Sequence, residues 1–126
     1  MPWKAVRRRD DADGVVLTAN LAQLGRDLGQ QITFLGQLEE TSVDAEGDFK
    51  VAYSKVFRNA TGSVEDRKQA AICETDPLWR IWGKAAAAVR MQRESLKALH
   101  ARIEIGRTMV SREKALVSLA GRDGTP

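Results

Sequence analysis

The sequence predicts an all-α protein, a long antiparallel helical hairpin of the coiled-coil kind with a short connecting helix. Two stretches of the chain each carry an apolar seam in which the spacing alternates between four and three residues without interruption. A mean spacing of 3.5 residues is typical of helices that pack along a narrow stripe. The two seams have similar lengths and stand close together in the chain, which favours an antiparallel return.

The seams define which residues should face the other helix. The first seam consists of Leu17, Leu21, Leu24, Leu28, Gln31, Leu35, Leu38, Ser42, Ala45, Phe49, Ala52 and Val56. The second consists of Leu78, Trp82, Ala85, Val89, Gln92, Leu96, Leu99, Ile103, Gly106, Val110, Glu113 and Val117. We expect Val56 to lie opposite Leu78 across a short connector, and this register places Leu21 opposite Glu113.

Three further contacts follow from this register. They pair Ser42 with Gln92, Glu39 with Arg93, and Tyr53 with Trp79. The first pair is a polar layer, which costs stability but fixes the alignment because a slipped register would leave both groups unsatisfied. The second is an ion pair and the third an aromatic stack.

The expected segments form one hairpin domain with short flexible ends. They are a flexible arm at residues 1–16, a helical-hairpin domain at residues 17–120 built from helices at 16–59, 64–75 and 77–120, and a flexible tail at residues 121–126. Gly62 suits the end of a helix, and Ser63 with Asp66 resembles a capping box for the next one. Pro77 suits the first position of the third helix, after Asp76 as its N-cap. The first helix should continue through Gly47 because the seam keeps its phase there.

The composition indicates a folded protein of the cytoplasm. The chain has 126 residues, of which 43% are hydrophobic and 29% charged. It contains no run of about 18 apolar residues and begins without the apolar core of a signal peptide, so we expect no membrane segment. The single Cys73 cannot form an internal disulfide and suits a small apolar position of a helix, with a reactive thiol as the alternative.

Charge is divided unevenly along the chain. Residues 17–59 contain four basic and six acidic side chains, whereas residues 78–122 contain ten basic and three acidic ones. A cationic helix favours a polyanionic partner such as single-stranded DNA, with an acidic protein surface as the alternative. The candidate nucleic-acid-binding residues are Arg90, Arg93, Lys97, Arg102, Arg107, Arg112 and Lys114. Trp79 could stack on a base.

One edge of the third helix carries more apolar residues than a two-helix coil needs. Its members are Ile81, Ala88, Met109 and Leu116. The candidate protein-interface residues are Trp79, Met109, Leu116 and Leu119. Exposed apolar stripes are uncommon on monomers, so we expect a homo-oligomer or contact with a host or phage protein.

The sequence contains no recognisable catalytic or metal site. One histidine and one cysteine, far apart in the chain, cannot supply the ligands of a usual zinc site, and the glycines are too isolated to cradle a phosphate. We therefore expect no enzyme activity, no metal and no cofactor. His100 suits a surface position better than a catalytic one.

Three stretches resemble small helical early-region proteins of actinobacterial phages and prophages. They are Ala52-Tyr53-Ser54-Lys55-Val56-Phe57, the segment Thr61-Gly62-Ser63-Val64-Glu65-Asp66-Arg67-Lys68-Gln69-Ala70, and Ile103-Glu104-Ile105-Gly106-Arg107 followed by Ser111-Arg112-Glu113. The resemblance covers about residues 45–120 and implies an accessory role in DNA recombination or replication, with no catalytic residue. The alternative is an adaptor or inhibitor that binds a host enzyme or defence system through its apolar edge.

Overall fold

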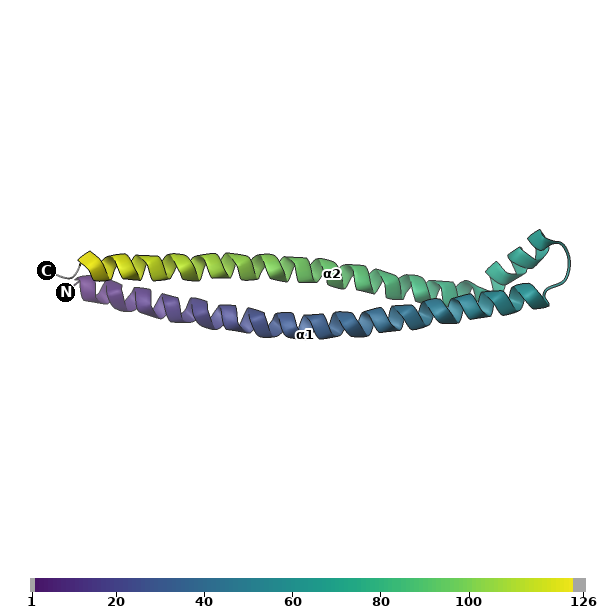
Figure 1. The fold of residues 1–126 in the computed structure, drawn as a ribbon, viewed down its shortest axis with the longest axis horizontal. Coiled ribbons are helices and arrows are strands. Elements are labelled where there is room, and N and C mark those ends of the chain that lie inside the picture. The colour runs from purple at the N-terminus through teal and green to yellow at the C-terminus, as the bar shows by residue number, and fades with distance from the viewer. Residues whose placement is uncertain (1, 124–126) are drawn as a thin grey trace. The chain divides into compact units, whose positions relative to one another are not determined.

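The computed structural model describes the backbone of residues 2–123 and the side chains of residues 13–121. It contains two α-helices, α1 (Pro2–Asn59) and α2 (Val64–Asp123), with no strand among these residues. The two helices pack against each other, which confirms the expected all-α helical hairpin (Figure 1). Met1 and residues 124–126, which belong to the expected flexible arm and tail, lie outside the described residues.

The helices are longer than the seams predict. A helix start at residue 16 is wrong, because α1 already begins at Pro2. Adding residues to an existing helix needs no new nucleation, and arginine and alanine favour the helix, so the added turns require no seam. At the other end, α2 continues to Asp123 rather than stopping at residue 120. Continuity of α1 through Gly47 is confirmed.

The chain forms two compact units, each with residues from both helices. The terminal unit contains residues 1–31 and 95–126, and the loop unit contains residues 32–94. In each unit a stretch of α1 packs against an antiparallel stretch of α2 (Figure 1). Both units therefore have the simplest helical core, a single interface between two helices.

The turn in the loop unit follows the sequence-based expectation. Gly62 has a φ of 107°, a left-handed value that only glycine adopts without strain. The Ser63 backbone N–H donates to the Asp66 carboxylate at 3.2 Å, and the Asp66 N–H donates to the Ser63 hydroxyl at 3.1 Å. This reciprocal pair is a capping box with aspartate in the usual glutamate position, and it starts α2 at Val64.

The separate helices expected at 64–75 and 77–120 are wrong, because α2 passes through Pro77 without a break. Asp76 does not act as an N-cap but accepts a hydrogen bond from the Arg80 side chain at 2.7 Å. Two residues of the preceding turn are buried: Ala71 is fully covered, and the buried Thr75 hydroxyl donates to the Ala71 carbonyl at 2.6 Å. This packing holds the helix together where proline removes one backbone hydrogen bond, and α2 bends in this part of the loop unit (Figure 1).

Replacing Pro77 with alanine should raise the free energy of unfolding by about 1 to 3 kcal/mol, because alanine restores the missing backbone hydrogen bond. Urea denaturation followed by circular dichroism measures the change. Gly83→Ala is the control, since a Cβ there meets no atom within 4 Å and should add only about 1 kcal/mol. A destabilised Pro77→Ala variant would instead show that the bend is needed for the burial of Ala71 and Thr75.

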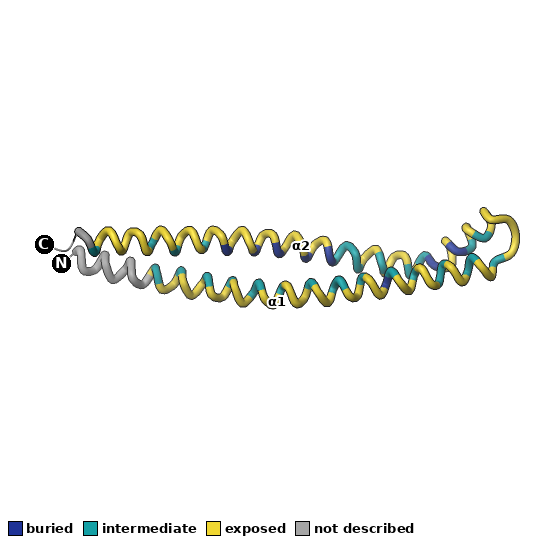
Figure 2. The backbone as a smooth tube through the Cα atoms, viewed as in Figure 1, coloured by how far each residue is buried: buried dark blue, intermediate teal, exposed yellow. Residues whose placement is uncertain are grey.

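Burial follows the predicted seams closely (Figure 2). Every predicted seam residue of α1 is buried or half-buried, and so is every one of α2 except Val117. The buried hydrophobic residues among those described are Ala45, Ala71, Val89, Leu96, Leu99 and Ile103. Only Ala71 lies outside the predicted seams, because the first turns of α2 join the interface. The narrow stripe that the 3.5-residue spacing predicts is therefore confirmed.

The predicted register is wrong in the terminal unit by one heptad. A Cβ on Gly106 would lie 3.3 Å from Leu21, and a Cβ on Gly14 would lie 3.5 Å from Glu113. The sequence had placed Leu21 opposite Glu113, seven residues further along α2. The error arose because the first turns of α2 were assigned to a separate connecting helix. A shift of seven residues keeps every seam residue in the interface, so the apolar pattern alone does not detect it.

In the loop unit, too, the first turns of α2 belong to the interface and not to a separate connecting helix. The sequence predicts that the first contact after the turn joins Val56 and Leu78. Instead Arg67, in the first turn of α2, lies over the Phe57 ring, 4.5 Å from its centroid. The Arg67 side chain also donates to the Phe57 carbonyl at 3.0 Å. The two helices therefore pair from the turn onwards.

Aromatic rings fill the interface beyond this point of the loop unit. Phe49 stacks on Trp82 with centroids 5.6 Å apart, and Tyr53 stacks on Phe57 rather than on Trp79 as expected. The expected ion pair between Arg93 and Glu39 is present at 2.9 Å. Pairing of Ser42 with Gln92 stays a prediction.

Candidate nucleic-acid interface

The two sides of α2 in the terminal unit differ sharply in chemistry. One side is formed by the residues that directly follow a seam residue, and the other by those that directly precede one. We call the first the basic side, which consists of Lys97, His100, Glu104, Arg107, Ser111, Lys114 and Ser118. We call the second the apolar side, which consists of Ser95, Ala98, Arg102, Ile105, Met109, Arg112 and Leu116, together with Leu119, seven residues after Arg112. All of these residues are exposed.

The basic side brings together three of the predicted nucleic-acid-binding residues, Lys97, Arg107 and Lys114. Glu104 is its one acidic residue, and the Arg107 guanidinium donates to Glu104 at 3.0 Å within the same helix. Both side chains of this pair are about two-thirds exposed, so the pair is weak and Arg107 can exchange Glu104 for another anion.

In the loop unit, Arg90 and Arg93 occupy the equivalent positions after Val89 and Gln92. The Arg93 ion pair with Glu39 has exposed side chains on both partners and is a surface contact of the same weak kind. Trp79 lies on this side as well, since it follows the seam residue Leu78, and it is 54% exposed. An exposed aromatic ring and two arginines therefore share one side of α2 in this unit.

The structure separates two of the predicted nucleic-acid-binding residues from the others. Arg102 precedes the buried Ile103, and Arg112 precedes Glu113, so both belong to the apolar side. The seven basic residues that the sequence grouped together thus divide between two sides of α2.

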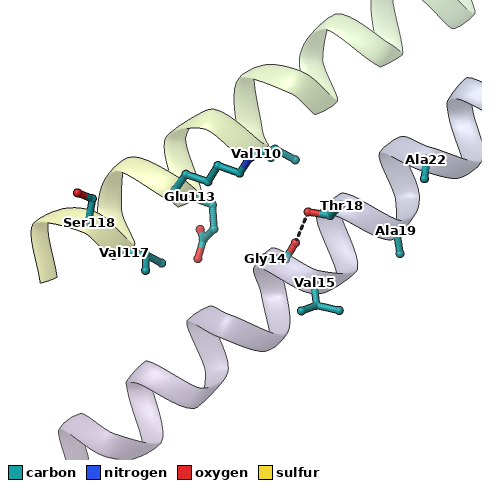
Figure 3. A pocket seen from close by; sticks show the side chains of 10 residues that line it. Gly14, Val15, Thr18, Ala19, Ala22, Val110, Glu113, Val117 and Ser118 are labelled. Carbon is teal, nitrogen blue, oxygen red and sulfur yellow. Dashed lines mark hydrogen bonds between the residues drawn. The ribbon is translucent and has the colours of Figure 1, made fainter. Parts of the chain in front are cut away.

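An apolar groove of about 690 Å³ lies between α1 and α2 in the terminal unit (Figure 3). Its lining consists of Gly14, Val15, Thr18, Ala19, Ala22, Val110, Glu113, Lys114, Val117 and Ser118. The α1 residues that line the groove have small side chains, so the groove is shallow on this side. The Thr18 hydroxyl donates a hydrogen bond to the Gly14 carbonyl at 2.9 Å within α1. Lys114 and Ser118 of the basic side border the groove. A cation therefore lies at the margin of this shallow apolar groove.

The predicted protein-interface residues also divide between the sides. Met109, Leu116 and Leu119 lie exposed on the apolar side in the terminal unit. Trp79 borders a smaller pocket of about 290 Å³ in the loop unit, beside Phe49 and Tyr53. Its exposed ring remains available to a ligand from solution.

Other kinds of site find no support within the described part of the chain. No group of three or more histidine, cysteine, aspartate or glutamate residues among those described could hold a metal ion. No helix in that part is long and apolar enough to cross a membrane. Cys73 is exposed rather than packed as expected of a small apolar residue.

The sequence separated an apolar edge of α2 from its cations, but the cations themselves were not sorted between the two sides. Arg102 and Arg112, which precede seam residues, were grouped with Lys97, Arg107 and Lys114, which follow them. Sorting every residue by whether it follows or precedes a seam residue would have revealed both sides. The groove could not be found this way, because it depends on the register.

Comparison with known protein families, with curated proteins and with solved structures finds no match to this chain.

Proposed function

We propose that this protein is a non-enzymatic nucleic-acid-binding accessory protein whose basic side of α2 contacts the backbone of single-stranded DNA. Such a protein would assist recombination or replication of phage or prophage DNA, as the sequence resemblance implies. The observation that carries the proposal is the composition of the basic side in the terminal unit: three exposed cations, one histidine, one acid and no large apolar residue.

Phosphate contact accounts for this composition better than solubility alone. A helix that needs only to stay soluble can mix acidic and basic residues on its exposed sides, as α1 does with Asp48 and Lys50. Here Arg107 and Lys114 are seven residues apart and Lys97 precedes Arg107 by ten on the same side, so the three cations can contact phosphates along one strand. The weak ion pairs of Arg93 and Arg107 cost little to exchange for phosphate.

Single-stranded DNA fits better than a duplex because of the loop unit. Proteins that bind single strands combine a cationic track with aromatic rings on which bases stack. Trp79 supplies an exposed ring on the side that also carries Arg90 and Arg93. A duplex keeps its bases stacked internally and offers no base to this ring.

A salt titration tests the proposal. We expect a fluorescently labelled single strand to bind with a dissociation constant of about 10⁻⁴ to 10⁻⁶ M near physiological salt, the range of sequence-independent contacts. Three to five phosphate contacts predict a slope of roughly −2 to −3.5 in a plot of log K against log salt concentration. Fluorescence anisotropy from 50 to 300 mM salt measures it. Absence of binding at 50 mM salt, or affinity that does not change with salt, would contradict the proposal.

A further inference from the structure

The pocket beside Trp79 in the loop unit has walls of aromatic rings. Its volume is about 290 Å³, and its lining consists of Phe49, Tyr53, Ile72, Thr75, Asp76 and Trp79. On the α1 wall, the ring centroids of Phe49 and Tyr53 lie 6.0 Å apart. Phe49 also stacks on Trp82 at 5.6 Å. Tyr53 stacks on Phe57 at 6.4 Å. Contacts with neighbouring rings therefore hold this wall in place before a guest enters.

The α2 wall of the pocket contains the Trp79 ring, which is 54% exposed. No aromatic ring among the described residues stacks on Trp79. The volume of about 290 Å³ stands at the lower end of the range for small-molecule sites. The pocket therefore suits a guest of one flat ring system that stacks on the indole.

Asp76 gives the pocket a hydrogen-bond acceptor. Its Oδ2 accepts from the Arg80 Nε at 2.7 Å, and the two side chains are 43% and 69% exposed. An ion pair this exposed is weak, and a carboxylate has about four lone-pair sites, so Asp76 can also accept N–H donors from a guest. Arg80 offsets part of the carboxylate charge, which limits the repulsion between Asp76 and a phosphate.

Among the DNA bases, guanine complements a carboxylate best. Its Watson–Crick edge presents the N1–H and the N2 amino group side by side, and a carboxylate can accept both in two parallel bonds. Adenine and cytosine each present one amino group beside a ring-nitrogen acceptor, and thymine presents one N–H between two carbonyls. Those acceptors repel a carboxylate, so the acid selects guanine.

We propose that this pocket binds a guanine base of the single strand, stacked on Trp79 with its Watson–Crick edge at Asp76. The inference rests on the proposed function and deepens it, because phosphate contacts alone read no sequence. Arg90 and Arg93 follow Trp79 by 11 and 14 residues on the same side of α2. At 1.5 Å per residue they lie about 16 to 21 Å along the helix, where they can contact phosphates of the same strand.

Anisotropy titrations with three labelled strands of 15 nucleotides at 50 mM salt test the base preference. One repeats thymine-thymine-guanine, the second repeats thymine-thymine-adenine, and the third contains thymine alone. Adenine controls for purine stacking, since it lacks the paired donors of guanine. We expect the guanine strand to bind the wild type about fivefold more tightly than the adenine strand, the lower end of what a bidentate base contact gives.

Asp76→Asn should bring this ratio close to one and leave the affinity for the thymine strand nearly unchanged. Glu74→Gln is the matched control, because it removes the same charge from an exposed position of α2 outside the pocket lining. It should keep the fivefold ratio. Equal binding of the guanine and adenine strands by the wild type, or a guanine preference that survives Asp76→Asn, would overturn the inference while the proposed function stands. Absence of binding to all three strands would overturn both.

Trp79→Ala gives a second readout through stacking. We expect it to weaken binding of the guanine strand by about fivefold or more, the loss typical of an aromatic ring on which a base stacks. Ile81→Ala is the control, since Ile81 is 55% exposed on α2 and lies outside the pocket lining. It should bind as the wild type does, and circular dichroism should show the same helix content for both variants. Unchanged binding by Trp79→Ala would contradict the proposed stacking.

Discussion

Replacing Arg107 and Lys114 together with glutamine is expected to weaken binding of single-stranded DNA about tenfold near physiological salt. Each phosphate contact with a single strand contributes a slope of about −0.7, so losing two contacts should also make the salt dependence less steep by about 1.4. Glutamine keeps a long side chain and a good helix propensity, so the fold should be unaffected. Fluorescence anisotropy across a salt series gives both quantities.

Arg102→Gln/Arg112→Gln is the matched control for this prediction. It removes the same net charge from the same stretch of α2, but from the apolar side. If binding depends on a defined basic side, the control should keep most of the wild-type affinity and nearly the full salt slope. Equal losses in the two variants would mean that DNA senses only the total charge of the helix, and the basic side would then have no special role.

Ile103→Ala is expected to destabilise the terminal unit by about 2 to 4 kcal/mol. Ile103 is 5% exposed and is one of the few buried hydrophobic residues among those described. Truncating it removes apolar burial and leaves a cavity that two helices can close only in part. Because a small domain is stable by only about 5 to 15 kcal/mol, this single change should lower the denaturation midpoint strongly.

Ile32→Ala provides the comparison, since the same truncation falls on an exposed side chain of α1. Urea denaturation monitored by circular dichroism should show a change of about 0.5 kcal/mol or less for this variant. If both variants lost equal stability, the seam would not be the main source of stability. A small effect of Ile103→Ala alone would show that α2 is held mainly by other contacts.

The fold could be predicted because the seam depends on local spacing. Each residue's position on the stripe follows from its neighbours four and three residues away, and burial confirms it along both helices apart from Val117. The capping box at Ser63 and Asp66 is equally local and was also predicted. Features within one or two helical turns were thus accessible from the sequence.

The register and the helix ends could not be predicted in the same way. Pro77 favours a helix start by its local chemistry, but burial of Ala71 and Thr75 outweighs this preference in the folded chain. Because the predicted long helix began at Pro77, the prediction paired α1 with residues seven positions too far along α2 in the terminal unit. The contact of Gly106 with Leu21 therefore needed the three-dimensional structure.

The candidate site was predicted in composition but not in arrangement. The sequence identified the cations of α2, yet it grouped Arg102 and Arg112 with Arg107 and Lys114. In the structure the first two lie on the apolar side and the last two on the basic side. It also named Met109, Leu116 and Leu119 as an interface, and these residues are exposed on the apolar side. The 690 Å³ groove depends on how α1 and α2 align and left no signal in the sequence.

The central claim is that the basic side of α2 in the terminal unit holds single-stranded DNA by charge. Light scattering of the protein with a single-stranded oligonucleotide, at 50 mM and at 500 mM salt, tests it most directly. We predict that the oligonucleotide adds its mass to the protein at 50 mM salt and is free of the protein at 500 mM salt, because salt weakens phosphate contacts. An oligonucleotide that stays bound at 500 mM salt, or one that does not bind at 50 mM salt, would contradict the claim.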